Sequence, residues 1–199
     1  MSAAQRRARL IAVLVAVVAV AGALLVLVSG GDDDASGSSG PAAEDVELTT
    51  AAGLSQLLDD VAAELGDSKV DNLTVFPDYA VFDRAVPGKP GRSESYRYEI
   101  EDGRGRTTRS GGDSSRTSAG VPVDLAALRP NVPTVIGLLY GADRTLGVTD
   151  PTDVHLSMKR DDNVGQVVTI YVQNRDIGAV GYLTVGFDGK VRDVDRADR

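Results

Sequence analysis

The chain has 199 residues, of which 42% are apolar and 25% charged, and its formal net charge is −8 at pH 7. This length allows one ordinary domain or two small ones. The absence of cysteine excludes disulfides, thiolate metal sites, cysteine nucleophiles and lipid attachment to cysteine. A single histidine, His155, excludes a multi-histidine metal centre. The acidic charge argues against a nucleic acid partner, which would need a basic face.

The N-terminal part of the chain has the pattern of a membrane anchor. Residues 1–9 form a basic cytoplasmic tail with three arginines, and residues 10–28 are nineteen residues without a polar side chain. A helix of that length spans roughly 28 Å, close to the hydrocarbon thickness of a bilayer. Because basic residues stay in the cytoplasm, we expect a single-pass cell-membrane protein whose C-terminal domain is extracytoplasmic. The alternative is a cleaved signal peptide, with small residues at 28–30 as the cleavage site.

Two low-complexity stretches separate the folded parts of the chain. Residues 29–45 have almost no apolar content and are predicted to be a flexible acidic tether. Residues 103–120 are predicted to be a flexible basic loop, which either contacts an anionic polymer or lipid headgroups or serves as a mobile solvated connection. These stretches leave two folded units, at 46–102 and 121–199. The arginines of the basic loop are Arg104, Arg106, Arg109 and Arg116.

The first unit, residues 46–102, is predicted to contain one helix followed by strands. Apolar residues recur at intervals of three and four between Leu54 and Leu65, which places them on one helical face. Thr50 is expected to cap this helix and Gly66 to end it. Strands are predicted at 73–76, 79–85 and 95–101, before a turn at Asp102 and Gly103.

The second unit, residues 121–199, repeats this order. Asp124 is expected to cap a short turn, and a second helix is predicted over 133–146, ending at Gly147. The fold class is therefore α+β, with an N-terminal transmembrane helix and then two similar units, each of one helix packed on a small antiparallel sheet of about three or four strands. Strands are predicted at 154–159, 167–174, 180–187 and 190–195, the last two joined by a turn at Asp188 and Gly189.

The matching order suggests an internal duplication, but the faces of the strands disagree. When positions are counted back from the Asp-Gly turn of each unit, the apolar residues fall on even positions in one unit and on odd positions in the other. A shift of one residue exchanges the two faces of a strand, so the two sets would lie on opposite faces. A duplication therefore requires a β-bulge, or the units are not true repeats. The two sets are Tyr96, Tyr98 and Ile100 in the first unit, and Leu183, Val185 and Phe187 in the second.

Three segments have a distinctive sequence, at 73–80 (LTVFPDYA), at 124–128 (DLAAL) and at 181–191, which contains Gly-Tyr and then Asp-Gly-Lys-Val. They resemble uncharacterised membrane-anchored proteins of actinobacteria. The helix-and-sheet units are similar in architecture to PepSY-like domains, which occur in exported proteins and protease propeptides. These resemblances imply an exported, non-catalytic role, one specific form of which is the inhibition or regulation of a protease. They imply no catalytic or ligand-binding residues.

The sequence contains no motif of a catalytic or metal site that we could identify. G-x-S-x-G and S-x-x-K are absent, and Gly103 and Gly105 lead into low-complexity sequence rather than joining a strand to a helix, as a phosphate loop requires. Residues 161–165 suggest a calcium loop, but its twelfth position is Val172 rather than glutamate, which favours a polar hairpin turn. We therefore predict no catalytic residue, no cofactor and no metal site, and the binding residues stay undefined.

His155 lies in a predicted strand in which it alternates with apolar residues. Since Leu156 and Met158 take the core face, His155 should lie on the polar face beside Ser157 and Lys159. The ordinary pKa of histidine, about 6.5, would allow it to sense pH. The alternative is an exposed histidine without a function.

These features favour a non-enzymatic, membrane-tethered extracytoplasmic binding or interaction module. We expect its partners to be the lipid bilayer, through the N-terminal helix, and an exported or envelope protein that it regulates, or a small ligand. A tether raises the effective concentration of the domain near membrane-proximal partners. The alternatives are a hydrolase of envelope polymers that uses paired carboxylates, favoured by a deep acidic cleft, and a structural spacer in an envelope complex.

Overall fold

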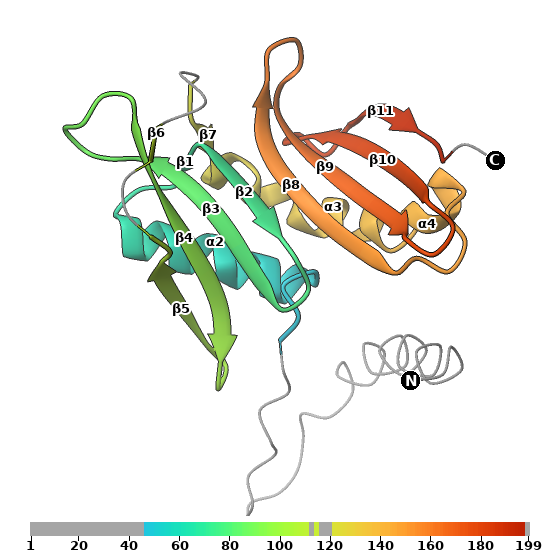
Figure 1. Cartoon of the computed structure of the whole chain (residues 1–199), viewed down its shortest axis with the longest axis horizontal. Coiled ribbons are helices and arrows are strands. Elements are labelled where there is room, and N and C mark those ends of the chain that lie inside the picture. Colours follow the sequence, from blue (N-terminus) through green and yellow to red (C-terminus); the bar gives the residue numbers. More distant parts are fainter. Residues whose placement is uncertain (1–45, 112–113, 116–120, 198–199) are drawn as a thin grey trace, which may run out of the picture. The chain divides into compact units, whose positions relative to one another are not determined.

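One antiparallel sheet joins both halves of the chain (Figure 1). The computed structural model describes residues 46–111, 114–115 and 121–197. The strands are β2 (Asn72–Val75), β3 (Tyr79–Ala85), β4 (Arg92–Glu101), β5 (Arg104–Arg109), β6 (Ser114–Ser115), β8 (Asp153–Asp161), β9 (Gly165–Asn174), β10 (Ala179–Gly186) and β11 (Val191–Asp195). They lie in the order β11-β10-β9-β8-β2-β3-β4-β5, and β6 pairs with β4. A separate ribbon pairs β1 (Lys69–Val70) with β7 (Val123–Asp124).

The helices cover one face of this sheet, behind the strands in Figure 1. They are α2 (Ala51–Leu65), α3 (Val132–Leu139) and α4 (Ala142–Leu146), with 3-10 turns at Leu125–Ala127 and Arg129–Asn131. The predicted caps of the first helix are confirmed, because the Thr50 side chain accepts a hydrogen bond from the Gly53 N–H and Gly66 is left-handed. The second helix, predicted to be continuous, is broken at Tyr140 and Gly141, where the Gly141 backbone leaves helical geometry.

The prediction of two small, separate sheets is wrong, although the α+β class and the antiparallel pairing are confirmed. The strand with which each half enters the large sheet, β2 in the first and β8 in the second, pairs with the other at the centre of the sheet. Leu73 lies opposite Met158, and Val75 lies opposite Leu156. All four side chains are fully buried. An isolated half would leave one of these strands as an apolar edge, and the pairing satisfies its backbone groups while it buries its side chains.

Part of the predicted flexible basic loop at 103–120 is an ordered strand, β5. Asp102 and Gly103 both have positive φ and form a two-residue turn that continues the hairpin from β4. The strand is at the sheet edge, where polar side chains face water, and Arg106 pairs with Glu101 at 3.1 Å. Low-complexity composition therefore concealed an edge strand, because such a strand needs no apolar residues to be stable beside its neighbour.

The disagreement between the strand faces of the two halves has a local cause. The turn between β4 and β5 has two residues, whereas four residues separate β10 from β11. The register of β10 with β11 also shifts between Thr184 and Val185. Counting back from the turns therefore compares positions that are not equivalent. The halves share the order of a helical part and four strands, and a common origin of the two stays a prediction.

The predicted membrane helix at 10–28 lies outside the described residues. No helix between residues 46 and 197, as far as this part of the chain is described, is both long enough and apolar enough to cross a bilayer.

A buried tyrosine links the sheet to α2. Tyr98 on β4 is fully buried, and its hydroxyl donates a hydrogen bond to Asp60 Oδ2 at 2.7 Å. Burial, followed by this hydrogen bond, raises the pKa of Tyr98. On the same face Tyr96 donates to Glu94 Oε1 at 2.6 Å, and burial with this bond raises the pKa of Tyr96 to about 12. Both hydroxyls are therefore protonated in the folded protein at pH values where an ordinary tyrosine ionises.

We expect the free energy of unfolding to fall as pH rises above about 10, because the unfolded chain releases protons that the folded chain retains. The stabilisation is complete below the ordinary tyrosine pKa and is lost as pH rises through the folded pKa. Each retained proton adds a slope of up to about 1.4 kcal/mol per pH unit. Urea unfolding at pH 9, 10 and 11 measures it. Tyr98→Phe should make the dependence shallower, and an unchanged dependence in that variant would contradict the assignment.

Candidate functional site

The sheet face opposite the helices, termed here the open face, is not covered by any helix of the described chain (Figure 1). Side chains alternate along each strand, so the residues between the core positions point to this face. One row of them consists of small hydroxyl side chains at directly paired positions of neighbouring strands. This row is Thr74 on β2, Ser157 on β8, Thr169 on β9 and Thr184 on β10.

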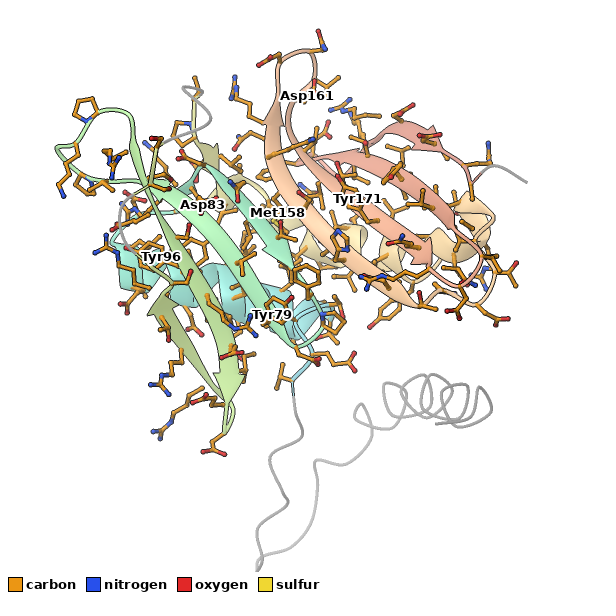
Figure 2. All side chains as sticks on the ribbon, in the orientation of Figure 1. Tyr79, Asp83, Tyr96, Met158, Asp161 and Tyr171 are labelled. Carbon is orange, nitrogen blue, oxygen red and sulfur yellow. The ribbon has the colours of Figure 1, made fainter. Side chains whose placement is uncertain are left out.

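Beside the hydroxyl row lies a row of aromatic rings, termed the aromatic row. Its members are Phe76, Tyr79, His155, Tyr171 and Tyr182. Successive ring centroids are 4.6 to 5.0 Å apart, so each ring contacts the next. Figure 2 labels Tyr79 at the start of β3 and Tyr171 on β9, on the two halves of the sheet. The row therefore crosses from one half of the chain to the other.

Strand register builds this row from residues far apart in the sequence. His155 lies opposite Tyr171 in the pairing of β8 with β9, and Tyr171 lies opposite Tyr182 in the pairing of β9 with β10. In the first half, the turn between β2 and β3 brings Phe76 beside Tyr79, since the Phe76 N–H donates to the Tyr79 carbonyl at 2.8 Å. The pairing of β2 with β8 then places Phe76 against His155.

Two of the four ring pairs are stacked, whereas Phe76 and His155 are tilted by 34° and Tyr171 meets Tyr182 edge to face at 83°. The interplanar angle is 23° for Phe76 and Tyr79 and 9° for His155 and Tyr171, both stacked geometries. The other face of Tyr79 is covered by Arg97, whose Cζ lies 3.8 Å from the ring centroid. Sugars and nucleobases bind aromatic residues by stacking on a free ring face. Ring edges that carry hydroxyl and imidazole groups suit contacts with a protein surface.

Charged side chains lie at one end of the aromatic row and beside its middle. Arg97, at the Tyr79 end, forms an ion pair with Glu99 at 2.7 Å, and its hydrogen bond to Glu99 raises the pKa of Arg97. Beside the middle ring, His155 Nδ1 lies 3.3 Å from Asp153 Oδ1, and Asp153 also pairs with Arg175. These partners hold Arg97 and His155 in place.

The predicted face of His155 is confirmed, and its surroundings were missed. The pairing places it on the same face as Ser157 and Lys159, and 23% of its side chain is exposed. The sequence predicted a histidine on a polar surface, whereas the ring is held between Phe76 and Tyr171. The only sequence signal for these neighbouring rings is the alternation of polar and apolar residues in β8 and β9. That alternation gives the face of each side chain but not the register of one strand against the next.

The segment considered as a calcium loop, 161–165, is a hairpin turn between β8 and β9, as the favoured interpretation predicted. Its first carboxylate is occupied by the backbone, since Asp161 Oδ1 accepts the N–H groups of Asn163 and Val164. Within the described ranges, no three histidine or acidic residues gather as a metal site.

Two open surface depressions lie away from the aromatic row. One is lined by residues of α4 and the following loop, including Asp143, Arg144 and Asp150. The other is lined by the turn between β4 and β5, including Glu101 and Arg104. Both are wide open to solvent, and neither is the deep acidic cleft that would favour a hydrolase.

Comparisons with known proteins identify relatives without an assigned activity. No protein family model and no solved structure match the chain. Two uncharacterised proteins of Mycobacterium tuberculosis, Rv0048c and MT0054, are each 29% identical to it over 154 residues, or 74% of the chain. The chain spans about half the length of these curated relatives. The chain is thus similar to uncharacterised actinobacterial proteins, whereas the PepSY-like architecture and the membrane anchor stay predictions.

Proposed function

We propose that this chain is a non-enzymatic binding module, tethered to the membrane by residues 10–28, that docks an exported protein on its open face. The aromatic row is the observation that carries the proposal. Protein interfaces are enriched in tyrosine and arginine, and a few such residues dominate the binding energy. Tyr79, Tyr171 and Arg97 supply these residue types on one uncovered surface.

The arrangement of the row also lowers the entropic cost of binding. Side chains that lose rotamer freedom at an interface reduce affinity, and those already held in place lose less. Tyr171 contacts His155 on one side and Tyr182 on the other, and Arg97 is held by Glu99 and Tyr79. The row is therefore organised before a partner arrives. The acidic tether at 29–45 would keep this surface close to partners in the envelope.

Photo-crosslinking in intact cells tests the proposal. A photoreactive phenylalanine analogue replaces Tyr182 in the full-length chain, and the matched control carries it at Tyr140, an exposed tyrosine that directly follows α3. We expect a discrete protein adduct from position 182 and none from position 140. In the variant that carries the photoreactive residue at position 182, the further substitution Tyr79→Ser should reduce the adduct by about tenfold, as loss of an interface hot spot does.

The outcomes separate the parts of the proposal. Equal adducts from positions 182 and 140, or no adduct from either, would overturn docking on the open face. Protease added to the intact cells should remove the adduct if the domain is extracytoplasmic. An adduct that resists protease until the cells are lysed would contradict the location and leave the docking surface supported.

A further inference from the structure

The two edge strands of the sheet carry opposite charge. Within the described residues, no strand pairs with the outer side of β5 or of β11. Strand β5 contains three arginines and no acid, whereas β11 contains two aspartates and Arg192, and Arg192 is ion-paired with Asp188 of the preceding turn. Exposed edge strands are ready to pair with another chain unless something prevents it. The charges on the open face disfavour pairing between two copies of the same edge. Two β5 strands would place arginine opposite arginine, and two β11 strands would place aspartate opposite aspartate.

The charged side chains of both edges lie on the open face with the same spacing. In the strand register, Arg104 lies opposite Glu101 of β4 and Arg106 lies opposite Glu99. Glu99 in turn lies opposite Tyr79 of the aromatic row. Asp193 and Asp195 lie opposite Thr184 and Tyr182 of β10, which point to the same face. Each edge therefore presents two like charges two residues apart on one side of the sheet.

Strand direction allows these edges to meet in a second copy of the chain. Eight strands lie in the main path and each is antiparallel to its neighbours, so β5 and β11 run in opposite directions. A second copy placed alongside in the same orientation continues the antiparallel order, with its open face on the same side.

We propose that β5 of one copy pairs with β11 of the next copy, with Arg104 opposite Asp195 and Arg106 opposite Asp193. Each arginine then lies between two strands that carry acids, since Glu99 lies opposite Arg106 and Glu101 opposite Arg104 in the register, and the Glu101 carboxylate contacts Arg106. Arg104, Asp193 and Asp195 have no ion-pair partner among the described residues, so these charges are available. The contact uses different surfaces of the two copies, and it is therefore open-ended rather than closed into a dimer.

Disulfide trapping in the full-length chain tests this register, because the chain has no cysteine of its own. Arg104→Cys and Asp195→Cys are combined in one chain, and directly opposite positions in paired strands allow disulfide geometry. Oxidation in intact cells should give a ladder of dimers, trimers and longer products on a non-reducing gel. Each single variant can give dimers at most. The register control combines Arg104→Cys with Arg192→Cys, three residues away, and should give at most about one tenth of the ladder.

Charge reversal gives a second measurement that does not depend on the disulfide. In the chain with the cysteine pair, Arg106→Asp should reduce the ladder by about tenfold, and adding Asp193→Arg should restore it. The same reversals in the cysteine-free chain should lower and then restore its mass in sedimentation, more strongly at low salt. Absence of a ladder, products that stop at dimers, equal products from the register control, or no rescue would each overturn the proposal.

Discussion

Replacing Leu156 with alanine is expected to lower the free energy of unfolding by about 2–5 kcal/mol. Leu156 is fully buried on β8, opposite Val75 of β2 and Ile170 of β9. It thus lies where the two halves of the sheet meet, in a core cluster that contains residues of both halves. The loss combines the transfer of the removed side chain with the cavity left among rigid neighbours.

Both halves should respond to this substitution in a single transition. Thermal unfolding followed by circular dichroism should show one midpoint, lowered by roughly 4–20 °C. Amide hydrogen exchange in β3 and in β10 should accelerate together, because neither half retains a complete core alone. Ser157→Ala, on the open face of the same strand, is the matched control and should change the stability by less than about 0.5 kcal/mol. Undiminished protection in β3 of the Leu156 variant would contradict a shared core.

Gly53→Ala is expected to destabilise the protein by about 1–3 kcal/mol, the cost of overpacking a close contact. In an ordinary helix this change gains up to about 1 kcal/mol, so the expected sign is reversed. A Cβ atom at Gly53 would lie 2.1 Å from the Glu47 carbonyl oxygen. That oxygen accepts hydrogen bonds from the backbone N–H and the hydroxyl of Thr50, so moving it also disturbs the N-terminus of α2.

Gly137→Ala is the matched control for this prediction. Gly137 lies in the interior of α3 and has nothing within 4 Å of an added Cβ atom. The substitution should therefore stabilise the protein by about 0.5–1 kcal/mol. Urea unfolding of the two variants should move the midpoint in opposite directions. A gain in stability for both would show that the approach of Glu47 to α2 is looser than the structure indicates.

The local signals in the sequence predicted elements well and their partners poorly. The helix from Thr50 to Gly66 was predicted with its caps, because capping and glycine chemistry act within a few residues. The bounds of β3 were also predicted correctly. The break at Gly141 and the strand at 104–109 were missed, since neither produces a change of periodicity. Relatives without an assigned activity add no functional residue to what the chain itself shows.

The candidate site shows the same division most sharply. Alternation in the sequence placed His155 on the polar face, and the structure confirms that placement. Alternation does not say which residues of other strands lie beside it. Its contact with Phe76 depends on the pairing of β2 with β8, two strands about eighty residues apart in the chain. The aromatic row could therefore not be predicted, because the contact of Phe76 with His155 joins strands distant in sequence and the contacts of Tyr171 depend on the register of two hairpins.

The sequence by itself determined the α+β class, most helix and strand segments, the capping residues of the first helix and the faces of the side chains on β4, β8 and β10, because these depend on neighbours within a few residues. Only the tertiary structure decided that the two halves share one sheet, that aromatic rings from both halves form a row, and that oppositely charged strands end up at the two edges. The physical reason is that an apolar strand edge lowers its free energy by pairing with any matching strand. The pattern of one strand does not identify that partner.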